Sequence, residues 1–332
     1  FIRRFRDRYS IVGLSRSARR TTPDGPAQWR RSDLYGIEQI ERALAGCDVA
    51  LYLVHSMSPS ARLTQARFED LDLILADNFA RGAAAAGVKH IIYIGGLLPD
   101  DNDLSKHLAS RLEVEEALAA HGAQVTTLRA GLVVGGGGSS FRILQRLVAR
   151  LPIMLCPAWT QTETQPIAVD DIVELVSRCI DDPELAGQTW DVGGPDRRTY
   201  QQMIADVAEV MGKRRWLVRV PFFSPGLSRL WVALVTSTPR ALVNPLVESL
   251  RHRMVPRDRA LQQKTGIDGM PWREAARIAL EPAPKVAALD GPLRRGAFVA
   301  RRTVRSVQRL PRPTGASASS VAEEYLRWLP RF

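Results

Sequence analysis

Two side chains with complementary chemistry stand one helical turn apart in the segment 105–120. His107 and Arg111 are spaced i and i+4, which places them on one face of a helix. Imidazole has the unperturbed pKa nearest neutrality, so His107 could serve as a general acid. Arg111 could hold a ribose or a phosphate, but its high pKa excludes it as a base. The alternative is a surface pair at a helix start, partnered by the aspartates of 100–103.

A run of four glycines and a pair of aspartates are further candidates. The glycines 135–138 follow one apolar run and precede a helical one, so they could form an anion-binding nest, although flexibility is the plainer interpretation. The run lacks the GK[ST] of a nucleotide-triphosphate loop, which excludes a kinase or ATPase of that type. Asp170 and Asp171 open a predicted helix, where capping and the helix dipole explain them. No Gly-x-Ser-x-Gly elbow supports a hydrolase.

The cysteines and histidines are too dispersed for a disulfide framework or a metal site. Cys47, Cys156 and Cys179 show no CxxC spacing, and the five histidines show no HExxH pattern. The sequence therefore predicts no bound metal and favours a reducing cytoplasm.

Short apolar runs alternate with helical segments, and the connections between them are short. The runs typical of buried strands are 9–15, 49–54, 90–94 and 124–129. The helical segments are 36–45, 66–86, 105–120 and 141–150, and Gly46, Gly87 and Gly122 end the first three. Such alternation predicts parallel strands joined by right-handed crossovers, which is an α/β, doubly wound, Rossmann-like sheet.

Ligands of doubly wound sheets bind at the carboxyl ends of the strands, so the residues just after each strand should form the site. The residues expected to line a dinucleotide are Ser15, Arg16, Ser17, Asp33, Leu34, Leu53, Val54, His55, Gly95, Gly96, Ala130 and Gly131.

Arg16 bears on the kind of dinucleotide. An acidic residue just past this strand would bind the 2′-hydroxyl of NAD, whereas arginine accommodates the 2′-phosphate of NADP. A guanidinium suits a phosphate because it presents two donors side by side. The competing interpretation is a solvated loop arginine. The position favours NADP, with NAD as the second candidate.

An ordered set of segments resembles one known family. The matching segments are Leu14-Ser-Arg16, Asp33-Leu34, Leu51-Tyr-Leu-Val-His-Ser-Met57, Asp77-Asn-Phe79, Ile92-Tyr-Ile-Gly-Gly-Leu97, Leu128-Arg-Ala-Gly131, Pro166-Ile-Ala-Val-Asp-Asp-Ile172 and Asp191-Val-Gly-Gly-Pro195. Together they resemble the atypical, NmrA-like branch of the short-chain dehydrogenase/reductase superfamily. More narrowly, they resemble bacterial NAD(P)H-binding proteins with a following DUF2867 (SRPBCC-like) domain.

The resemblance implies a glycine-rich loop ahead of Phe1. Members of this branch open with a strand and a loop of the type GATGFIG, whose backbone amides approach the pyrophosphate. Phe1-Ile2 resembles the end of that motif, with Arg3 in place of its last glycine. The resemblance therefore implies a chain cut within the family's first domain, which by itself would bind the cofactor weakly.

The resemblance also gives His107 and Arg111 a position in the family's active site. Reductases of the superfamily use a Tyr-x-x-x-Lys pair with a serine from the preceding strand. His107 and Arg111 stand in the tyrosine and lysine places, and Gly95 or Gly96 stands where the serine would be. This arrangement is similar to the H-x-x-S-K-x-x-V-E pattern of NmrA-like members, with Arg111 replacing lysine.

Two neighbouring residues are weaker substitutes. Tyr93 lies inside a strand and is expected in the core, while Lys106 points about 100° away from His107 on a helix.

The composition changes near residue 282. Residues 1–280 are expected to form the dinucleotide-binding domain, with a substrate lobe from about 139–165 and 187–280. A linker over 281–303 and the start of a second domain over 304–332 are expected to follow. The tail resembles the opening strand and helix of DUF2867, and such a piece cannot bury a core alone.

The chain is strongly basic, with a formal net charge of +11 and a pI near 10.2. Nucleic acid and an anionic membrane are two explanations. The favoured one is an arginine-rich composition with solvated charges, because no nucleic-acid-binding motif accompanies the basic residues. The apolar stretch 227–250 is interrupted by arginines and prolines, which excludes a transmembrane helix. Peripheral contact with the inner membrane and packing inside the substrate lobe remain open.

The sequence therefore predicts an NAD(P)H-binding protein that reduces a small carbonyl or quinone-like substrate. The alternative is a non-catalytic dinucleotide-binding protein, either a redox sensor or an assembly and scaffold subunit. The degenerate Tyr-x-x-x-Lys pair strengthens this alternative.

Overall fold

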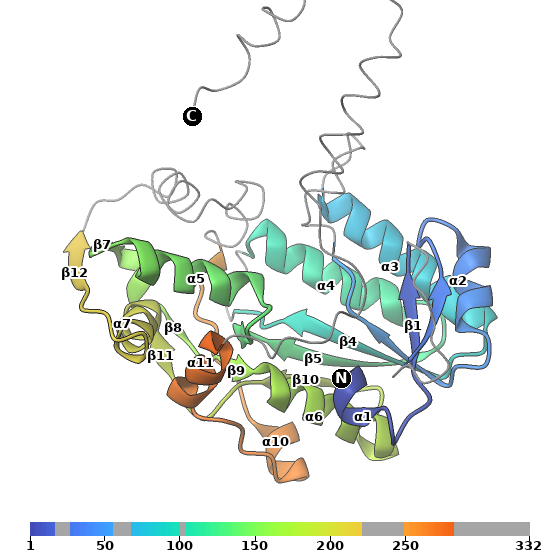
Figure 1. The fold of residues 1–332 in the computed structure, drawn as a ribbon. Coiled ribbons are helices and arrows are strands. Elements are labelled where there is room, and N and C mark those ends of the chain that lie inside the picture. The colour runs from blue at the N-terminus through green and yellow to red at the C-terminus, as the bar shows by residue number, and fades with distance from the viewer. Residues whose placement is uncertain (17–26, 56–67, 100–103, 221–248, 282–332) are drawn as a thin grey trace, which may run out of the picture. The chain divides into compact units, whose positions relative to one another are not determined.

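The computed structural model describes residues 1–16, 27–55, 68–99, 104–220 and 249–281 (Figure 1). The chain divides into two units, Phe1–Pro282 and Ala283–Phe332, and all described residues belong to the first. Ser17, most of the apolar stretch 227–250 and the tail 304–332 lie outside the described residues. The predicted linker and second domain therefore stay predictions.

Parallel strands form the centre of the described unit. The main sheet has the order β10-β5-β4-β3, and all of its pairings are parallel. Its strands are β3 (Val49–Tyr52), β4 (His90–Gly96), β5 (Gln124–Ala130) and β10 (Thr189–Val192). A separate parallel pair consists of β1 (Val12–Ser15) and β2 (Gln28–Arg31). No described strand pairs with both β1 and β3.

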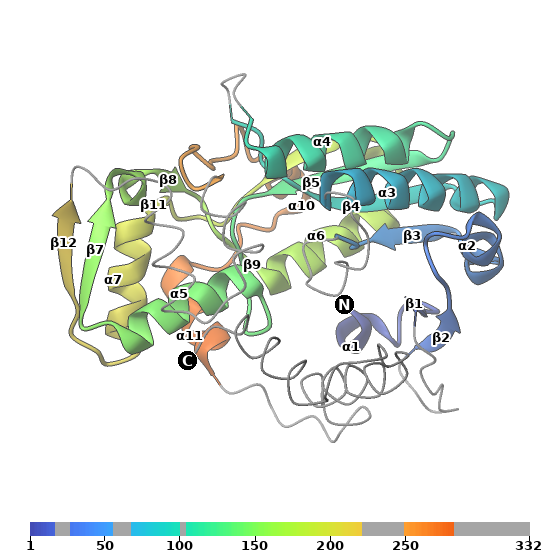
Figure 2. The ribbon, with the colours of Figure 1, turned by 90° about the horizontal axis from the view of Figure 1, so that it is seen from above.

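Helices cover both faces of the main sheet, as Figures 1 and 2 show. One face carries α2 (Ile37–Leu44), α3 (Phe68–Ala85) and α4 (Lys106–Ala119). The other face carries α6 (Val169–Asp181) and α10 (Ala260–Thr265). The α/β class with a parallel sheet between helices is confirmed.

Strand β4 shows why both faces must be covered. Ile91 and Tyr93 pack with the cluster under α3 and α4, while Ile92 packs with the cluster under α6. Successive side chains of a strand point to opposite faces, so an apolar run such as His90–Gly96 needs apolar neighbours on both. The run predicted as a strand is therefore a central one.

The remaining elements form smaller sheets and a helical lobe. The helices are α1 (Ile2–Phe5), α5 (Ser139–Arg150), α7 (Tyr200–Val210), α11 (Trp272–Leu280), and the 3-10 turns η2 (Ala158–Gln161) and η3 (Pro183–Leu185). The strands pair as β6 (Val133–Val134) with β9 (Ile167–Ala168), β7 (Ile153–Pro157) with β12 (Trp216–Val220), and β8 (Glu163–Thr164) with β11 (Arg198–Thr199). Trp272, which is 1% exposed, lies in the hydrophobic cluster formed by α5, β7, α7 and α11.

The predicted boundaries hold to within a few residues. Gly46 and Gly87 adopt left-handed φ values of 76° and 77° after α2 and α3, as their helix-stop positions predict. Strand β2 was not predicted, because its sequence Gln-Trp-Arg-Arg shows no apolar alternation. No helix among the described residues is both long and apolar enough to cross a bilayer.

An ion pair holds α4 against the sheet. Arg129 on β5 donates to both carboxylate oxygens of Glu115 on α4, at 3.0 and 2.9 Å. Their side chains are only 13% and 15% exposed, and Thr189 of β10 adds a hydroxyl bond of 3.0 Å to the same carboxylate. Paired donors of this kind fix orientation as well as distance.

We expect Glu115→Gln to lower the free energy of unfolding by about 2 kcal/mol, because the mostly buried guanidinium of Arg129 would lose its charged partner. Urea unfolding followed by circular dichroism measures the change. The matched control is Glu281→Gln, which removes the exposed pair with Arg277 at 57% and 56% exposure, and should cost less than about 0.5 kcal/mol. Equal losses in the two variants would contradict the role of the pair.

Candidate functional site

The candidate site lies where β3 and β4 end beneath helix α4. Tyr52 is the last residue of β3, and Tyr93 is the middle residue of β4, whose carboxyl end is Gly95-Gly96. Ser105 caps α4 by accepting a hydrogen bond from the amide of Leu108 at 3.4 Å, so the helix starts next to the strand ends. His107 and Arg111 occupy the first turns of α4 and are half-buried. The helix thus brings both residues to the edge where ligands of parallel sheets bind.

Arg111 is held by a buried phenol. Its Nη1 donates to the hydroxyl of Tyr93 at 3.4 Å, and that hydroxyl donates to the carbonyl oxygen of Arg111 at the same distance. Tyr93 is 1% exposed, so the expectation that it belongs to the core is confirmed. Burial raises the pKa of Tyr93, and the guanidinium of Arg111 opposes that rise. Tyr93 is therefore a core residue that also positions a site residue.

Two residues of this cluster were not predicted from the sequence. Tyr52 is 1% exposed, its hydroxyl has no hydrogen-bond partner among the described residues, and its ring lies 6.1 Å from that of Tyr93. Asp72 on α3 is 3% exposed. Burial, and then the charge of Asp72, raise the pKa of Tyr52. A single carboxylate between Leu71 and Leu75 was the signal in the sequence, since buried carboxylates are uncommon in core-facing helices.

Both histidines near the cluster favour the neutral form. Burial, then the charges of Arg111 and His55, lower the pKa of His107 from 6.5 to about 4. Desolvation of the imidazole by surrounding protein atoms, and then the charge of Arg111, lower the pKa of His55, although the residue as a whole is exposed. The guanidinium therefore carries the positive charge of this site near neutral pH.

The strand-end glycines and Ala130 lie close to the same helix and sheet edge. A Cβ on Gly96 would lie 3.3 Å from Leu108 and 3.8 Å from Arg111, while one on Gly95 would lie 3.2 Å from Thr127 and from Tyr93. Ala130 ends β5 and accepts the amide of Leu97 at 3.1 Å. The missing side chain of Gly96 lets α4 approach the end of β4, and that of Gly95 leaves room for Thr127 and Tyr93.

The remaining residues predicted for β5 and β3 border the same edge. A Cβ on Gly131 would lie 3.4 Å from Leu97. Leu53 follows β3 and is 60% exposed, and Val54 packs partly against the cluster under α3 and α4. The structure therefore brings together the predicted residues that follow β3, β4 and β5.

The residues predicted at the ends of β1 and β2 belong to the other sheet. Ser15 ends β1 and is followed by the exposed Arg16. The carboxylate of Asp33 accepts the backbone amide of Tyr35 at 3.2 Å. The carbonyl of Leu34 accepts the side-chain amide of Asn78 on α3 at 3.1 Å, and the Leu34 side chain packs on the cluster beneath α3. Asp33 thus stabilises the turn in which it lies, while the Arg16 side chain forms no hydrogen bond or ion pair with a described residue.

Two of the four glycines 135–138 pack closely against other elements. A Cβ on Gly135 would lie 2.9 Å from Val169, and one on Gly136 would lie 3.1 Å from the carbonyl of Ala279. None of the four has a positive φ, and the Gly138 amide already donates to the Gly135 carbonyl at 3.0 Å. The run therefore lets the start of α5 pass close to α6 and α11, and the nest geometry is not formed.

Asp170 and Asp171 lie in the first turn of α6, as the dipole interpretation predicts. Asp171 also accepts the amide of Met270 at 2.7 Å, and burial raises its pKa. These carboxylates are explained by structure.

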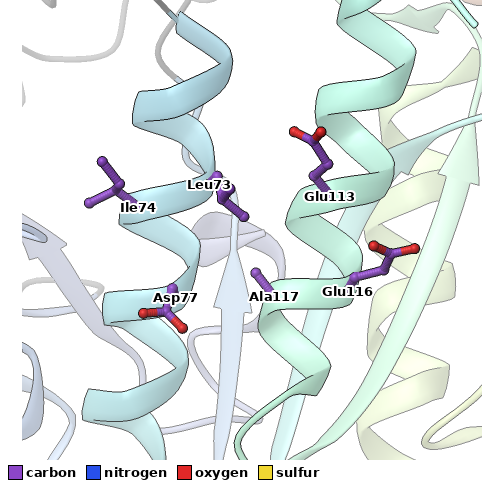
Figure 3. Close-up of a pocket in the computed structure, with 6 residues that line it drawn as sticks. All are labelled: Leu73, Ile74, Asp77, Glu113, Glu116 and Ala117. Carbon is purple, nitrogen blue, oxygen red and sulfur yellow. The ribbon is translucent and has the colours of Figure 1, made fainter. Parts of the chain in front are cut away.

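A separate shallow pocket of about 560 Å³ lies between the outer sides of α3 and α4 (Figure 3). Its lining residues are Leu73, Ile74, Asp77, Glu113, Glu116 and Ala117. None of them belongs to the His107–Arg111 cluster, and Asp77 is already paired with Arg81 and His121. No group of metal-ligating side chains occurs within the described ranges.

Comparisons with known proteins identify the fold. The structure of a nucleoside-diphosphate-sugar epimerase from Staphylococcus aureus has a TM-score of 0.63 at 17% identity, covering 80% of this chain and 90% of that one. An NADPH-dependent quinone oxidoreductase from Escherichia coli, solved with NADPH, has a TM-score of 0.61 at 19% identity, covering 80% and 89%. The fold is Rossmann-like. At these identities the likeness shows the fold alone.

Curated relatives match in part. Auxiliary protein GraX of Staphylococcus aureus is 36% identical over 106 residues, covering 32% of this chain and 31% of the relative. The NADH-ubiquinone oxidoreductase 40 kDa subunit, mitochondrial, of Neurospora crassa is 24% identical over 217 residues, covering 65% and 55%. The chain thus spans about a third to just over half of these relatives. No known family profile matches it.

We expect the imidazole of His107 to titrate near pH 4, well below the ordinary 6.5. Histidine proton resonances measured against pH test this, with His107→Gln providing the assignment. Arg111→Gln should raise the midpoint toward 6.5, because it removes a neighbouring positive charge. As pH falls from 6.5 toward 4, the unfolded chain binds this proton first, so wild type should lose stability that His107→Gln retains. A midpoint above pH 6 would contradict the burial of His107.

Proposed function

We propose that this chain belongs to the atypical, NmrA-like short-chain dehydrogenase/reductases and is an NADP-dependent oxidoreductase for a small carbonyl or quinone-like substrate. The observation that carries the proposal is the grouping of His107, Arg111 and Tyr93 at the carboxyl end of β4. In a Rossmann-like fold this edge receives dinucleotides. The resemblance of the tail 304–332 to DUF2867 stays a prediction, and the proposed function does not rest on it.

The residues present fit a nicotinamide dinucleotide. Gly95 and Gly96 leave the backbone bare at the end of β4, where a Cβ would crowd Tyr93 or Leu108. The glycines let α4 and Tyr93 pack at the end of β4, so that His107 and Arg111 lie at the edge where a dinucleotide would bind. Arg16 provides an exposed cation after β1, which suits the 2′-phosphate of NADP. Asp33, Leu34, Leu53, Val54, Ala130 and Gly131 would complete the lining. The E. coli quinone oxidoreductase with the same fold was solved with NADPH, which also supports this cofactor.

A bound nicotinamide would supply or accept a hydride. The protein's part is to orient the substrate and stabilise charge on its oxygen. Neutral His107 would donate a hydrogen bond to the carbonyl oxygen while the hydride is transferred, and the resulting alkoxide would take its proton from water. In the oxidation direction His107 would accept the hydroxyl proton as the hydride leaves. Its lowered pKa argues against the imidazolium as the resting acid at neutral pH. Arg111, fixed by Tyr93, would stabilise the developing negative oxygen without exchanging a proton.

A second candidate function is non-catalytic dinucleotide binding, as a sensor or scaffold. Glycines at 95 and 96 provide no hydroxyl, and a histidine at 107 leaves no phenol in the tyrosine place for a cation at 111 to activate. The similarity to the 40 kDa subunit of a mitochondrial NADH-ubiquinone oxidoreductase also favours this alternative. Binding without turnover would distinguish it from the enzyme.

We expect the chain to bind NADPH more tightly than NADH, and Arg16→Ala to weaken NADPH binding about tenfold while leaving NADH unchanged. The reason is loss of the charged partner of the 2′-phosphate. Titration of each nucleotide by its fluorescence, extended into the millimolar range, measures the preference. Arg42→Ala on α2 is the control for removal of one positive charge. A preference for NADH that is insensitive to Arg16→Ala would overturn the phosphate assignment.

We expect turnover of NADPH with a quinone and aldehyde panel, and a loss of about 100-fold in kcat for His107→Ala. Tyr93→Phe should lower kcat less than Arg111→Gln, since it loosens the guanidinium without removing it. Stopped-flow oxidation of NADPH at 340 nm measures these rates. Tight NADPH binding with no turnover in the wild type would reject the enzyme and support the sensor or scaffold.

A further inference from the structure

The strand pair β7–β12 lies at one end of the helical lobe, away from the main sheet (Figures 1 and 2). Several of its apolar side chains are exposed. Trp216 lies beside Ile153 and Val218 beside Leu155 in the parallel register. Trp216 is 71% exposed, Ile153 49% and Val218 44%. We call this set the β7–β12 face.

The other side of the same strands is the one that packs on the core. Met154 and Cys156 are 1% and 2% exposed, and Leu217 packs against the cluster around Trp272. Side chains alternate between the two sides of a strand, so this small sheet is apolar on both. A solvent-facing sheet side normally carries polar residues. The exposed apolar side therefore needs an explanation beyond folding.

The two sequence segments that contain β7 and β12 are rich in basic residues, with Glu163 and Glu209 just beyond their ends. Residues 141–162 and 210–220 contain seven lysines and arginines and no aspartate or glutamate: Arg142, Arg146, Arg150, Lys213, Arg214, Arg215 and Arg219. Arg215 is used within the fold, since its Nε donates to the carbonyl of Val148 at 2.7 Å near the end of α5.

Other cations of this group are available to a partner. Lys213 and Arg214 are exposed, and their side chains form no ion pair with a described residue. Arg219 is exposed too, but its register partner Cys156 places it on the other side of the pair. Lys213 and Arg214 come immediately before the strand that carries Trp216. Cations and an exposed indole thus lie at the same end of the lobe.

We infer that the β7–β12 face binds peripherally to an anionic phospholipid surface. Tryptophan is enriched at the level of the lipid headgroups. Aliphatic neighbours such as Ile153 and Val218 would insert at the boundary between the headgroups and the acyl chains. Lysines and arginines around them are attracted to acidic headgroups. Nucleic acid fits less well as the ligand. Proteins that bind single strands combine basic residues with aromatic residues that stack on the bases, and exposed aliphatic residues do not contribute to such binding.

The inference stands apart from the proposed oxidoreductase function. None of the residues of the β7–β12 face belongs to the His107–Arg111 cluster. The apolar residues 221–248 follow β12 in the sequence but lie outside the described residues, and they carry no part of the argument.

Vesicle flotation with the whole chain tests the inference. We expect the protein to float with phosphatidylcholine vesicles that contain phosphatidylglycerol, to stay behind with phosphatidylcholine alone, and to be released by high salt. The double variant Lys213→Glu/Arg214→Glu should reduce the bound fraction about tenfold. Arg42→Glu/Lys89→Glu makes the same change in net charge away from this face and should bind like wild type.

A fluorescence measurement separates insertion from charge attraction alone. Trp216 is largely exposed, so Trp216→Ser removes little packing and should fold. Brominated lipid should quench part of the wild-type tryptophan emission, and this quenching should be lost in Trp216→Ser.

Two results would overturn the inference. One is equal flotation of the two charge-reversed variants, which would assign binding to net charge. The other is absence of flotation together with binding of a single-stranded oligonucleotide that Lys213→Glu/Arg214→Glu abolishes, which would assign this face to nucleic acid.

Discussion

A parallel sheet that must be covered on both faces determines where everything else in this protein can lie. Ile91 and Tyr93 of β4 face the helices α3 and α4, and Ile92 faces α6. Because helix α4 has to pack on the sheet, its first turns arrive at the carboxyl end of β4. The bidentate pair of Arg129 and Glu115 then fixes the helix in that position. The placement of His107 and Arg111 is thus a consequence of covering the sheet.

Most helices and central strands could be predicted from the sequence, because they depend on patterns of residues close together in the chain. An apolar run such as 90–94 and a left-handed glycine such as Gly87 act through neighbouring residues only. Strand β2 escaped prediction because it gains its stability from partners distant in the chain. The side chain of Arg30, for example, bonds the carbonyls of Ala43 and Ala45, and nothing in the segment Gln28–Arg31 announces this.

The site shows the same division. The pairing of His107 with Arg111 follows from helical spacing, which a sequence states directly. Tyr52 and Asp72 come from different elements, and burial beside Arg111 is what makes them notable. Likewise, the glycines 135–138 suggest an anion nest until the packing of Val169 and Ala279 against them is known. Tertiary neighbours decide the role of such residues, and sequence position alone does not reveal them.

The separation between the pair β1–β2 and the main sheet has a mechanical consequence. Arg16 and Asp33 are carried by one body, and His55, Gly95 and Arg111 by the other. The two are joined by packing of Leu14 and Leu34, by the bond from Asn78 and by the bonds from Arg30 to the end of α2. No described ladder of backbone hydrogen bonds connects them. A ladder transmits displacement rigidly, whereas side-chain packing yields. A ligand that contacts both parts would therefore stabilise one arrangement of them. Its apparent affinity would be lowered according to the fraction of molecules that already have this arrangement.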